Sequence, residues 1–322
     1  MSPDSVLVAV GWVAAQVAMV VALSPLVLGG MARIKAMSQH RVGPPLLQGY
    51  RDLAKLFRKE PIRADSSSWV SRLAPPLAWA ATVAAIPFIP WILIPTPLDY
   101  AGDLLVVVGL FALGRFLGAI AALDAGTAFG GMGSSRDMWI GALVEPAFLV
   151  VILAFGAPAG ATQADAIVAY ALRTGVAYLT PALLLAGAAL VLVLLAEGGR
   201  IPVDNPSTHL ELTMVHEAMV LEYSGPELAL LEWTRALRFT ELAALLAALV
   251  VPWGIATNWG ALALTVGLAL YVAKLLGVAG GVAFLETRIA KWRLFRVADL
   301  AVFAVVLALG SVALTYLIGG AA

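Results

Sequence analysis

Eight apolar stretches, each about as long as a bilayer is thick, constrain this chain more than any other feature of its sequence. A helix needs about 20 predominantly apolar residues to cross the hydrocarbon core of a membrane. The stretches lie at 6–30, 70–94, 103–123, 138–157, 176–196, 236–256, 259–284 and 298–318. Hydrophobic residues make up 61% of the chain and charged residues only 12%, which is typical of a polytopic membrane protein. The sequence therefore predicts an all-α fold, a single integral membrane domain over 1–322 with eight transmembrane helices plus amphipathic cytoplasmic helices.

The distribution of positive charge predicts how this domain is oriented. Seventeen of the twenty Lys and Arg residues fall on one alternating set of connections between the stretches, whereas the opposite set holds only Arg173. Loops that are rich in Lys and Arg stay in the cytoplasm. We therefore expect both termini outside and the large loops in the cytoplasm. The first apolar run has no cationic segment before it, so we expect a retained span and not a cleaved signal.

Composition also excludes several classes of function. The formal net charge is zero, and nothing in the sequence indicates nucleic-acid binding. The chain has no cysteine, which excludes disulfides, thiolate-held Fe–S clusters and a cysteine-ligated metal within it. We predict no metal site and no cofactor in this chain.

The first predicted cytoplasmic connection, 31–69, combines a helix-breaking turn with an amphipathic helix. Gly43-Pro44-Pro45 predicts a turn that helical structure cannot cross. The helix expected after it has an apolar face, and its charged residues lie on the other faces. The apolar face is formed by Leu46, Leu47, Tyr50, Leu53, Ala54 and Phe57. This pattern predicts a helix that lies on anionic lipid headgroups.

A cytoplasmic segment at 197–235 gathers much of the negative charge of the chain. Seven of the twenty acidic residues lie within it, at Glu197, Asp204, Glu211, Glu217, Glu222, Glu227 and Glu232. Asn205-Pro206 and Ser224-Gly225-Pro226 predict a helix over about 207–223, with Glu211 and Glu222 on one face. A solvated acidic loop is the alternative. Interleaved apolar residues and rigid turns favour a packed structure.

Ionisable residues within the spans are expensive to bury, so they are candidates for function. Arg115 lies in the third span, Glu145 in the fourth and Lys274 in the seventh. A structural ion pair of Glu145 with Arg115 or Lys274 is the alternative. We expect Glu241 and Asp299 at the cytoplasmic interface. Pro87 and Pro90 should kink the second span, and Ser134-Ser135 should cap the fourth.

The run at 197–226 carries a resemblance to a known family. It reads EGGRIPVDNPSTHLELTMVHEAMVLEYSGP and closely resembles a loop of the membrane subunits of energy-converting NiFe-hydrogenases, the family of formate hydrogenlyase subunit 4 and hydrogenase-4 component C. More distantly it is similar to the NADH-quinone oxidoreductase subunit that lies at the heel of the complex I membrane arm. Ser207 and His209 stand where that complex I subunit has glutamates, and extra residues precede Glu222-Tyr223. Both departures favour the hydrogenase branch.

Two further motifs carry the same resemblance. His40-Arg41-Val42-Gly43-Pro44, Leu47-Gln48, Asp52 and Lys55 resemble the first-loop motif of the family. In complex I that loop helps to form the quinone entrance and docks the peripheral arm. Glu145 follows Arg136 by nine residues, which is similar to the spacing of a membrane glutamate in the complex I family.

The resemblance implies a non-catalytic membrane-anchor and coupling subunit of a complex-I-like, membrane-bound NiFe-hydrogenase of the formate hydrogenlyase type. Such a subunit links electron transfer in a peripheral arm to proton or sodium translocation in the cell inner membrane. The implied partners are the NiFe-hydrogenase large and small subunits, a ferredoxin-like Fe–S subunit, antiporter-like membrane subunits and membrane lipid. The NiFe centre and the Fe–S clusters would lie in those partners.

Two sets of residues are predicted to serve this function. The expected ion path comprises Glu145, Glu197, Glu211, Glu222, Asp204, Arg115 and Lys274. The residues expected to dock partners are Arg41, Gly43, Pro44, Asp52, Lys55, Arg136, Arg200, His209 and Arg293. Two alternatives stay open, namely a quinone-site subunit of respiratory complex I and an independent ion carrier.

Overall fold

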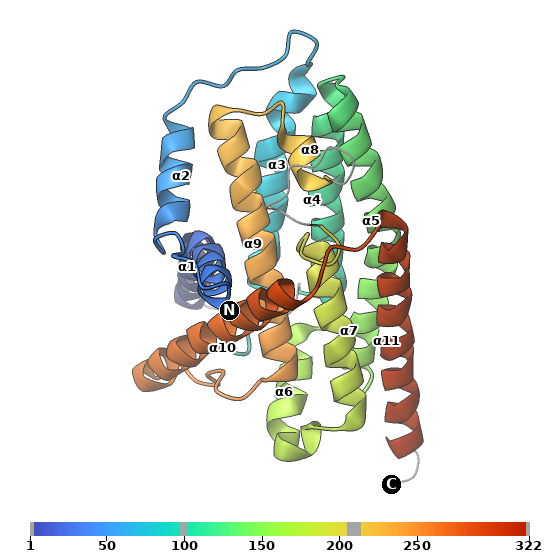
Figure 1. Ribbon diagram of the computed structural model, residues 1–322. Helices are drawn as coiled ribbons and strands as arrows, with labels where there is room; N and C mark the ends of the chain where they lie inside the picture. The colour runs from blue at the N-terminus through green and yellow to red at the C-terminus, as the bar shows by residue number, and fades with distance from the viewer. Residues whose placement is uncertain (1–2, 97–101, 205–213, 320–322) are drawn as a thin grey trace.

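The computed structural model describes residues 3–96, 102–204 and 214–319, and this part of the chain is helical with short connections (Figure 1). Its α-helices are α1 (Pro3–Ser38), α2 (Gln48–Phe57), α3 (Trp69–Ala85), α4 (Leu104–Asp124), α5 (Ala128–Gly156), α6 (Ala164–Thr174), α7 (Pro181–Glu197), α8 (His216–Val220), α9 (Gly225–Val250), α10 (Ala261–Arg288) and α11 (Val297–Gly319). Three 3-10 turns lie at Ile86–Phe88, Gly175–Tyr178 and Leu294–Arg296. The all-α prediction is confirmed for the described residues.

Apolar sequence explains most of the long helices, although the predicted number of spans is not confirmed. Each predicted stretch falls on a separate helix. Within the described residues, five helical segments are long and apolar enough to cross a membrane: Leu7–Ser38, Leu104–Asp124, Ala128–Gly156, Ala261–Arg288 and Leu294–Leu317. Helices α3 and α7 are shorter, at 17 residues each, and α9 carries several charges. Composition therefore establishes a multi-pass membrane protein with at least these five candidate spans.

Several boundaries differ from the prediction, and local chemistry explains them. Helix α3 does not kink at Pro87 but ends at Ala85, because proline lacks the N–H that would continue the helix. Helix α5 begins ten residues earlier than expected. Its N-cap is Thr127, whose hydroxyl accepts from the Gly130 N–H at 3.2 Å. Ser134 is therefore no cap: it lies inside α5 and donates to the Ala119 carbonyl at 2.9 Å.

The acidic segment also differs from the prediction. Residues 205–213 lie outside the described residues, and with them Glu211, His209 and the first part, 207–213, of the helix expected over 207–223. Within the described remainder, Met214 and Val215 are not helical, and α8 is only five residues long. The long helix α9 then begins at Gly225, so the last part of the expected loop is helix. Gly225 and Pro226 open this helix and stop the preceding one, as proline at the first helical turn commonly does.

Helix α9 lies at the centre of the molecule. It packs against α1, α2, α3, α7 and α10, and its side chains are buried along most of its length. Helices α3 and α7 run beside it, whereas α10 crosses at a slant (Figure 1). Helices α4, α5 and α11 pack against α3 and α7. Phe239 of α9, Leu190 and Leu194 of α7 and Phe148 of α5 are among the largest fully buried side chains. Polar residues on α9 are therefore held inside the bundle.

The amphipathic helix predicted in the first loop is present as α2. Its apolar face points to the bundle, where Phe57 packs edge-on against Trp233 of α9 with ring centroids 6.2 Å apart. The Tyr50 hydroxyl donates to the Ala22 carbonyl of α1. Lys55 and Asp52 remain exposed. Helix α2 is thus fixed to the bundle on one side and presents charge on the opposite side.

Candidate ion-coupling site

A cavity of about 110 Å³ lies among α4, α5, α8, α9 and the segment that follows α7. Its walls contain a concentration of ionisable groups, which are Arg115, Asp137, Glu197, Asp204, His216, Arg235 and Arg238. This volume has space for several waters. Charged side chains around a small polar cavity are the arrangement through which protons or ions move in membrane proteins.

Arg115 of α4 is the hub of this cavity, and its side chain is 5% exposed. Its Nη2 atom lies 2.9 Å from Glu197 Oε1 at the end of α7. Its Nη1 atom lies 3.2 Å from Glu145 Oε1, and its Nε atom lies 3.7 Å from Asp137 Oδ2. Gly141 makes room for this side chain, because a Cβ there would lie 2.8 Å from Arg115 Cδ. A single guanidinium therefore joins three carboxylates from two helices.

A second guanidinium approaches the same cluster from α9. Arg238 Nη1 lies 3.9 Å from Glu197 Oε2, and its Nη2 donates to the Phe111 carbonyl. Arg115, Arg238, Asp137, Glu145 and Glu197 form what we call the Arg115 cluster. Its three carboxylates outnumber its two guanidinium groups. With every member ionised, the cluster therefore has one more negative than positive charge, and the Asp137 and Glu145 side chains are still 24% and 31% exposed.

The segment after α7 ties this cluster to the opposite side of the cavity. Asp204 is 3% exposed. Its carboxylate lies 2.8 Å from Lys291 Nζ and accepts from the His216 N–H at 3.2 Å. The Trp292 N–H donates to the Pro202 carbonyl at 2.9 Å. The segment that begins at Glu197 is therefore held by residues after α10 and cannot move independently of them.

An ion pair between α1 and α10 also contacts this segment. Glu286 of α10 is buried, and its carboxylate lies 2.9 Å from Lys35 Nζ. The same carboxylate accepts from the Ile201 N–H at 3.4 Å. Arg200 lies between these contacts with its guanidinium 4.5 Å from the Phe239 ring. Burial, together with the nearby charge of Arg235, lowers the pKa of Arg200 to about 10.

His216 faces an unusually cationic environment. Burial, followed by the charges of Arg235, Arg238 and Arg200, holds the pKa of His216 well below its usual 6.5. The Nε2 atom of His216 is buried and has no hydrogen-bond partner among the described residues. His216 is therefore uncharged at neutral pH in the folded protein.

This neutral histidine predicts a pH dependence of stability. The unfolded chain takes up a proton at His216 as the pH falls below 6.5, whereas the folded chain does not, so stability falls toward acid pH. For one proton, the free energy of unfolding changes by at most about 1.4 kcal/mol per pH unit. We expect a smaller change here, because the side chain is 28% exposed. Between about pH 6.5 and pH 5, the thermal midpoint of His216→Gln in detergent should fall less steeply than that of the unchanged protein. His40→Gln, at an exposed position, is the matched control, and equal slopes in all three proteins would contradict the prediction.

The structure brings together some of the expected ion-path residues. Glu145 and Glu197 meet at Arg115, so the ion pair that the sequence left open for Glu145 is present. Asp204 lines the same cavity. Glu222 follows α8 in a turn and does not line the cavity, and Glu211 lies outside the described residues. Lys274 lies apart from the cluster, where its ammonium donates to the carbonyls of Val251 and Trp253 at 2.6 and 2.5 Å.

Sequence reasoning missed Asp137 and Arg238. Asp137, Gly141 and Glu145 recur every four residues, which places them on one face of α5. That spacing could have identified Asp137, but only if the helix had been predicted to begin before residue 138. Arg238 was assigned to a cytoplasmic flank, and its direction toward Glu197 depends on how α9 is rotated, which the sequence does not specify.

The expected docking residues divide into exposed and internal positions. Arg41, Pro44, Asp52, Lys55 and Arg293 are exposed, and Gly43 is partly exposed. Arg136 donates to the Met214 carbonyl at 2.7 Å, so it secures the segment before α8. Arg200 is 5% exposed, and this burial corrects its assignment as a docking residue. His209 lies outside the described residues.

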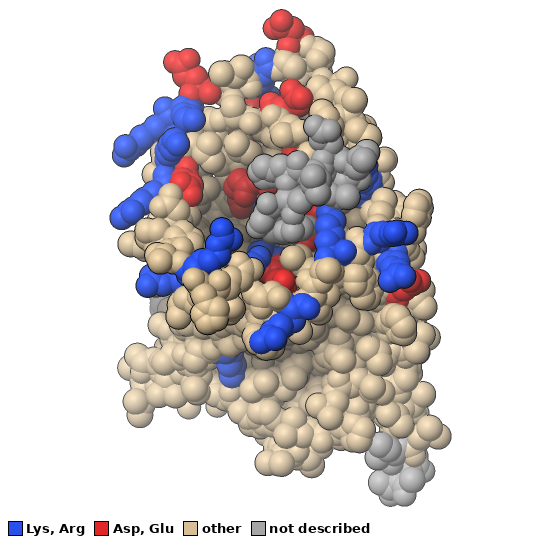
Figure 2. Space-filling model, in the orientation of Figure 1, with Lys and Arg blue, Asp and Glu red and all other residues tan. Residues whose placement is uncertain are grey.

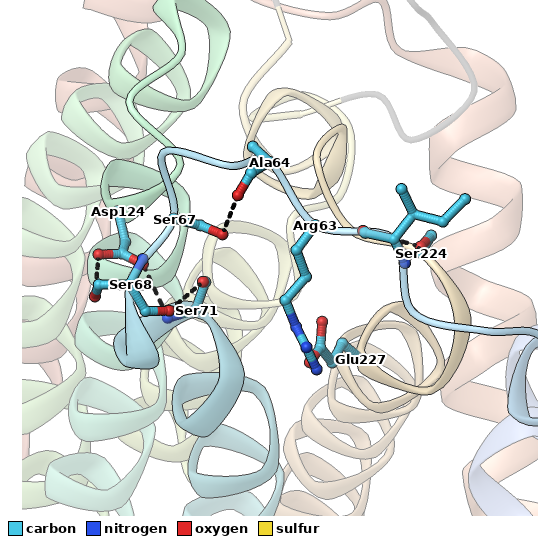
Figure 3. A network of polar contacts seen from close by, with 9 residues as sticks. Arg63, Ala64, Ser67, Ser68, Ser71, Asp124, Ser224 and Glu227 are labelled. Carbon is cyan, nitrogen blue, oxygen red and sulfur yellow. Dashed lines mark hydrogen bonds and ion pairs between the residues drawn. The ribbon is translucent and has the colours of Figure 1, made fainter.

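A polar network fixes the segment at 59–71, which leads from α2 into α3 (Figure 3). At its α3 end, Asp124 of α4 accepts from the N–H groups of Ser68 and Ser71 at 2.7 and 3.1 Å and from the Ser68 hydroxyl at 2.6 Å. These contacts satisfy helix-terminal N–H groups that would otherwise lack partners.

The middle of the same segment is bonded to the start of α9. The Ile62 N–H donates to the Ser224 hydroxyl oxygen at 2.7 Å. Arg63 Nε donates to Glu227 at 2.9 Å, as Figure 3 shows. Because its middle and its α3 end are both fixed to long helices, the 59–71 segment forms a rigid surface and not a flexible linker.

Charge is distributed unevenly over the molecular surface. In the view of Figure 2, Lys, Arg, Asp and Glu gather on the half that contains α2 and α8, whereas the half with α6 and the end of α11 is almost free of charge. Within the described residues, no three His, Asp or Glu side chains converge in an arrangement that could hold a metal ion. The polar half is therefore a surface for water or protein, and the apolar half a surface for lipid or apolar helices.

Comparison with known proteins gives consistent results. A sequence model of the NADH dehydrogenase family matches residues 11–317. Formate hydrogenlyase subunit 4 of Escherichia coli is 31% identical over 274 residues, which cover 85% of this chain and 88% of that protein. Hydrogenase-4 component C of Escherichia coli is 31% identical over 279 residues, which cover 87% of each chain.

A solved structure has the same fold. A chain of the membrane-bound sulfane sulfur reductase, an archaeal respiratory membrane complex, superimposes with a TM-score of 0.82. The match covers 94% of the present chain and 98% of that chain, at 20% identity. This likeness concerns the helical arrangement, and the functional argument depends on the cavity and its charged residues.

Proposed function

The chain belongs to the NADH dehydrogenase family, and from this premise we propose that it is the membrane-anchor and coupling subunit of a membrane-bound NiFe-hydrogenase of the formate hydrogenlyase type. The family and the two relatives at 31% identity make it a membrane subunit of a complex-I-like respiratory or hydrogenase complex. The two relatives support the hydrogenase type, and the coupling role rests on one observation, the Arg115 cluster. This cluster lies where helices of the bundle meet the segment that follows Glu197.

The coupling mechanism follows from electrostatics. Glu197 lies between Arg115 and Arg238, at 2.9 and 3.9 Å. A displacement of the segment after Glu197 would change these distances, and in a water-poor site such a change alters which carboxylate holds a proton. The Asp204–Lys291 and Lys35–Glu286 pairs connect that segment to its surroundings. We infer that movement of a docked redox arm reaches the Arg115 cluster through these contacts.

In this proposal the chain makes and breaks no covalent bonds. The expected partners are the NiFe large and small subunits and a ferredoxin-like Fe–S subunit on the cytoplasmic face, with antiporter-like subunits beside it in the cell inner membrane. Those subunits would supply the NiFe centre and the Fe–S clusters. The antiporter-like subunits would complete proton or sodium translocation.

Purification tests the proposal directly. A tagged chain extracted from its native membrane in mild detergent should retain a NiFe large subunit, and the complex should evolve hydrogen with an artificial electron donor. Recovery of the chain alone, with ion transport in vesicles, would identify an independent carrier. Recovery with an NADH-oxidising flavoprotein and quinone reduction would instead identify a complex I subunit.

The orientation is a separate prediction. We propose that all eight long helices cross the membrane with both termini outside, because the loop cations are almost all on one set of connections. A reporter fused after Thr257 should therefore be external, and one fused after Arg293 should be cytoplasmic. The same location for both reporters, or the reverse assignment, would reject this orientation.

The exposed cationic surface predicts where the peripheral arm docks. We propose that this surface comprises Arg41 and Lys55 together with Arg293, because these side chains are exposed while the adjoining 59–71 segment is rigid. Charge reversal at Arg41 and Lys55 together should release the peripheral subunits in a pull-down and leave the chain in the membrane.

The matched control for this experiment is Arg173→Glu. Arg173 is also exposed but lies at the end of α6, on the opposite set of connections. Its reversal should leave the complex intact. Release by Arg173→Glu, or retention of the arm after reversal of Arg41 and Lys55, would assign docking to another surface.

A further inference from the structure

Glu241 is a buried carboxylate that the Arg115 cluster does not include. It lies on α9 with 0% of its surface exposed, which corrects the expectation that it would lie at the cytoplasmic interface. Neither carboxylate oxygen has a hydrogen-bond partner among the described residues. An isolated charge in such a position is so unfavourable that the group is normally neutral. Glu241 is therefore a carboxylic acid whose proton-donating group still requires an acceptor.

The facing helix α10 contributes a second polar group without a partner. Tyr271 is 5% exposed, and its hydroxyl has no hydrogen-bond partner within the described residues. Its ring packs edge-on against Trp91 with centroids 5.3 Å apart, which fixes its direction. Buried polar groups of this kind are usually satisfied by ordered water.

A small cavity lies at this interface. It has a volume of about 10 Å³ and is lined by Tyr271 and Lys274 of α10 and by Ala244 of α9, among others. That volume is close to the minimum that holds one water. Ala244 follows Glu241 by three residues, so the two side chains share a face of α9. Tyr271 therefore lines the cavity directly, and Glu241 lies one helical turn from its wall residue Ala244.

We propose that Glu241 and Tyr271 hold bound water between α9 and α10 and connect the Arg115 cluster to Lys274. This proposal rests on the proposed function in one respect, since the connection has a purpose only if the cluster moves protons. Arg238 precedes Glu241 by three residues and reaches Glu197 at 3.9 Å. Lys274 donates to the carbonyls of Val251 and Trp253, just past the far end of α9.

We call this connection from the Arg115 cluster through Glu241 to Lys274 the Glu241 branch. Only protons are transferred along it. Lys274 first releases a proton toward the far end of α9 and is then an amine that can accept one. The bound water passes a proton to this amine as it takes the proton of the Glu241 carboxyl, and Glu241 then recovers a proton from the side of the cluster. No electrons move, and no bond to carbon changes. The branch gives Lys274 a place in the path despite its separation from the cluster.

Infrared difference spectroscopy of the intact purified complex tests this site independently of ion pumping. A neutral carboxylic acid has its own carbonyl stretching band, which shifts in deuterium oxide. We expect this band to disappear in Glu241→Gln. In Tyr271→Phe and in Ala244→Val it should persist at a changed frequency, because the first removes a hydrogen-bonding hydroxyl and the second fills the water cavity. Asp299→Asn, an exposed carboxylate on α11, is the matched control and should leave the band unchanged.

Two results would contradict the proposal that Glu241 and Tyr271 hold bound water. One is a band that persists in Glu241→Gln, and the other is an unchanged frequency in both Tyr271→Phe and Ala244→Val. Ion translocation separates this branch from the proposed function. If Glu145→Gln reduces translocation several-fold while Glu241→Gln and Ala244→Val translocate normally, the branch is wrong and the proposed function stands. If Glu145→Gln also translocates normally, the proposed function fails, and the infrared result still decides whether the acid and its water are present.

Discussion

Replacement of Arg115 by Gln is expected to destabilise the protein so strongly that little folded chain accumulates in the membrane. Glu197 would lose its ion pair at 2.9 Å while its side chain stays 2% exposed, and Asp137 and Glu145 would lose their nearest cation. Leaving a buried charge without its partner costs about 3–5 kcal/mol. The free energy of unfolding of a folded protein is roughly 5–15 kcal/mol, so this cost is a large part of it. Yield of monodisperse protein in detergent and its thermal midpoint measure the loss.

A second substitution distinguishes lost charge from lost shape. In the double variant Arg115→Gln with Glu197→Gln, the most deeply buried carboxylate is neutral, so much of the lost stability should return. Arg173→Gln, at an exposed site on α6, should be neutral and serves as the control. If the double variant is no more stable than Arg115→Gln alone, packing of the long side chain against α5 matters more than its charge.

The helices of this protein could be predicted from sequence because apolar runs are a strong and local signal. Each predicted stretch falls on one helix. The boundaries were less predictable where glycine or charged residues lie inside a helix. The start of α5 contains several glycines that resemble a loop, and Thr127 caps it from outside the apolar run. The start of α9 contains Glu227 and Arg235, which a hydropathy argument assigns to solvent but which the structure pairs with Arg63 and Glu217.

The candidate site was predictable only in part, for a different reason. Glu145 and Arg115 attract attention because each is an ionisable residue within an apolar run. Their grouping with Asp137, Glu197 and Arg238 depends on the rotation of four helices about their axes, and sequence spacing constrains positions only within one helix. Glu241 illustrates the same limit, since we expected it at the interface near the end of a span but it is 0% exposed inside the bundle.

Glu145→Gln is expected to separate hydrogen evolution from ion translocation. Gln keeps the volume and can still accept a hydrogen bond from Arg115, which now lies 3.2 Å from Glu145, so the complex should assemble. The substitution removes a group that can bind and release a proton, and it leaves the cluster with two carboxylates and two guanidinium groups. A balanced cluster has no tendency to hold the additional proton that coupling requires. Hydrogen evolution with an artificial donor should therefore continue while translocation into vesicles falls several-fold.

The control for this experiment is Glu60→Gln, which removes an exposed carboxylate between α2 and α3 and should affect neither activity. Glu197→Gln should resemble Glu145→Gln, because it removes the carboxylate that lies between both guanidinium groups. A complex that evolves hydrogen and translocates ions normally in both variants would make these glutamates structural. Loss of both activities in an assembled complex would instead indicate that the cluster is needed to hold the redox arm in place. Retained hydrogen evolution with lost translocation is the result that only a coupling role predicts, since a purely structural ion pair would affect both activities or neither.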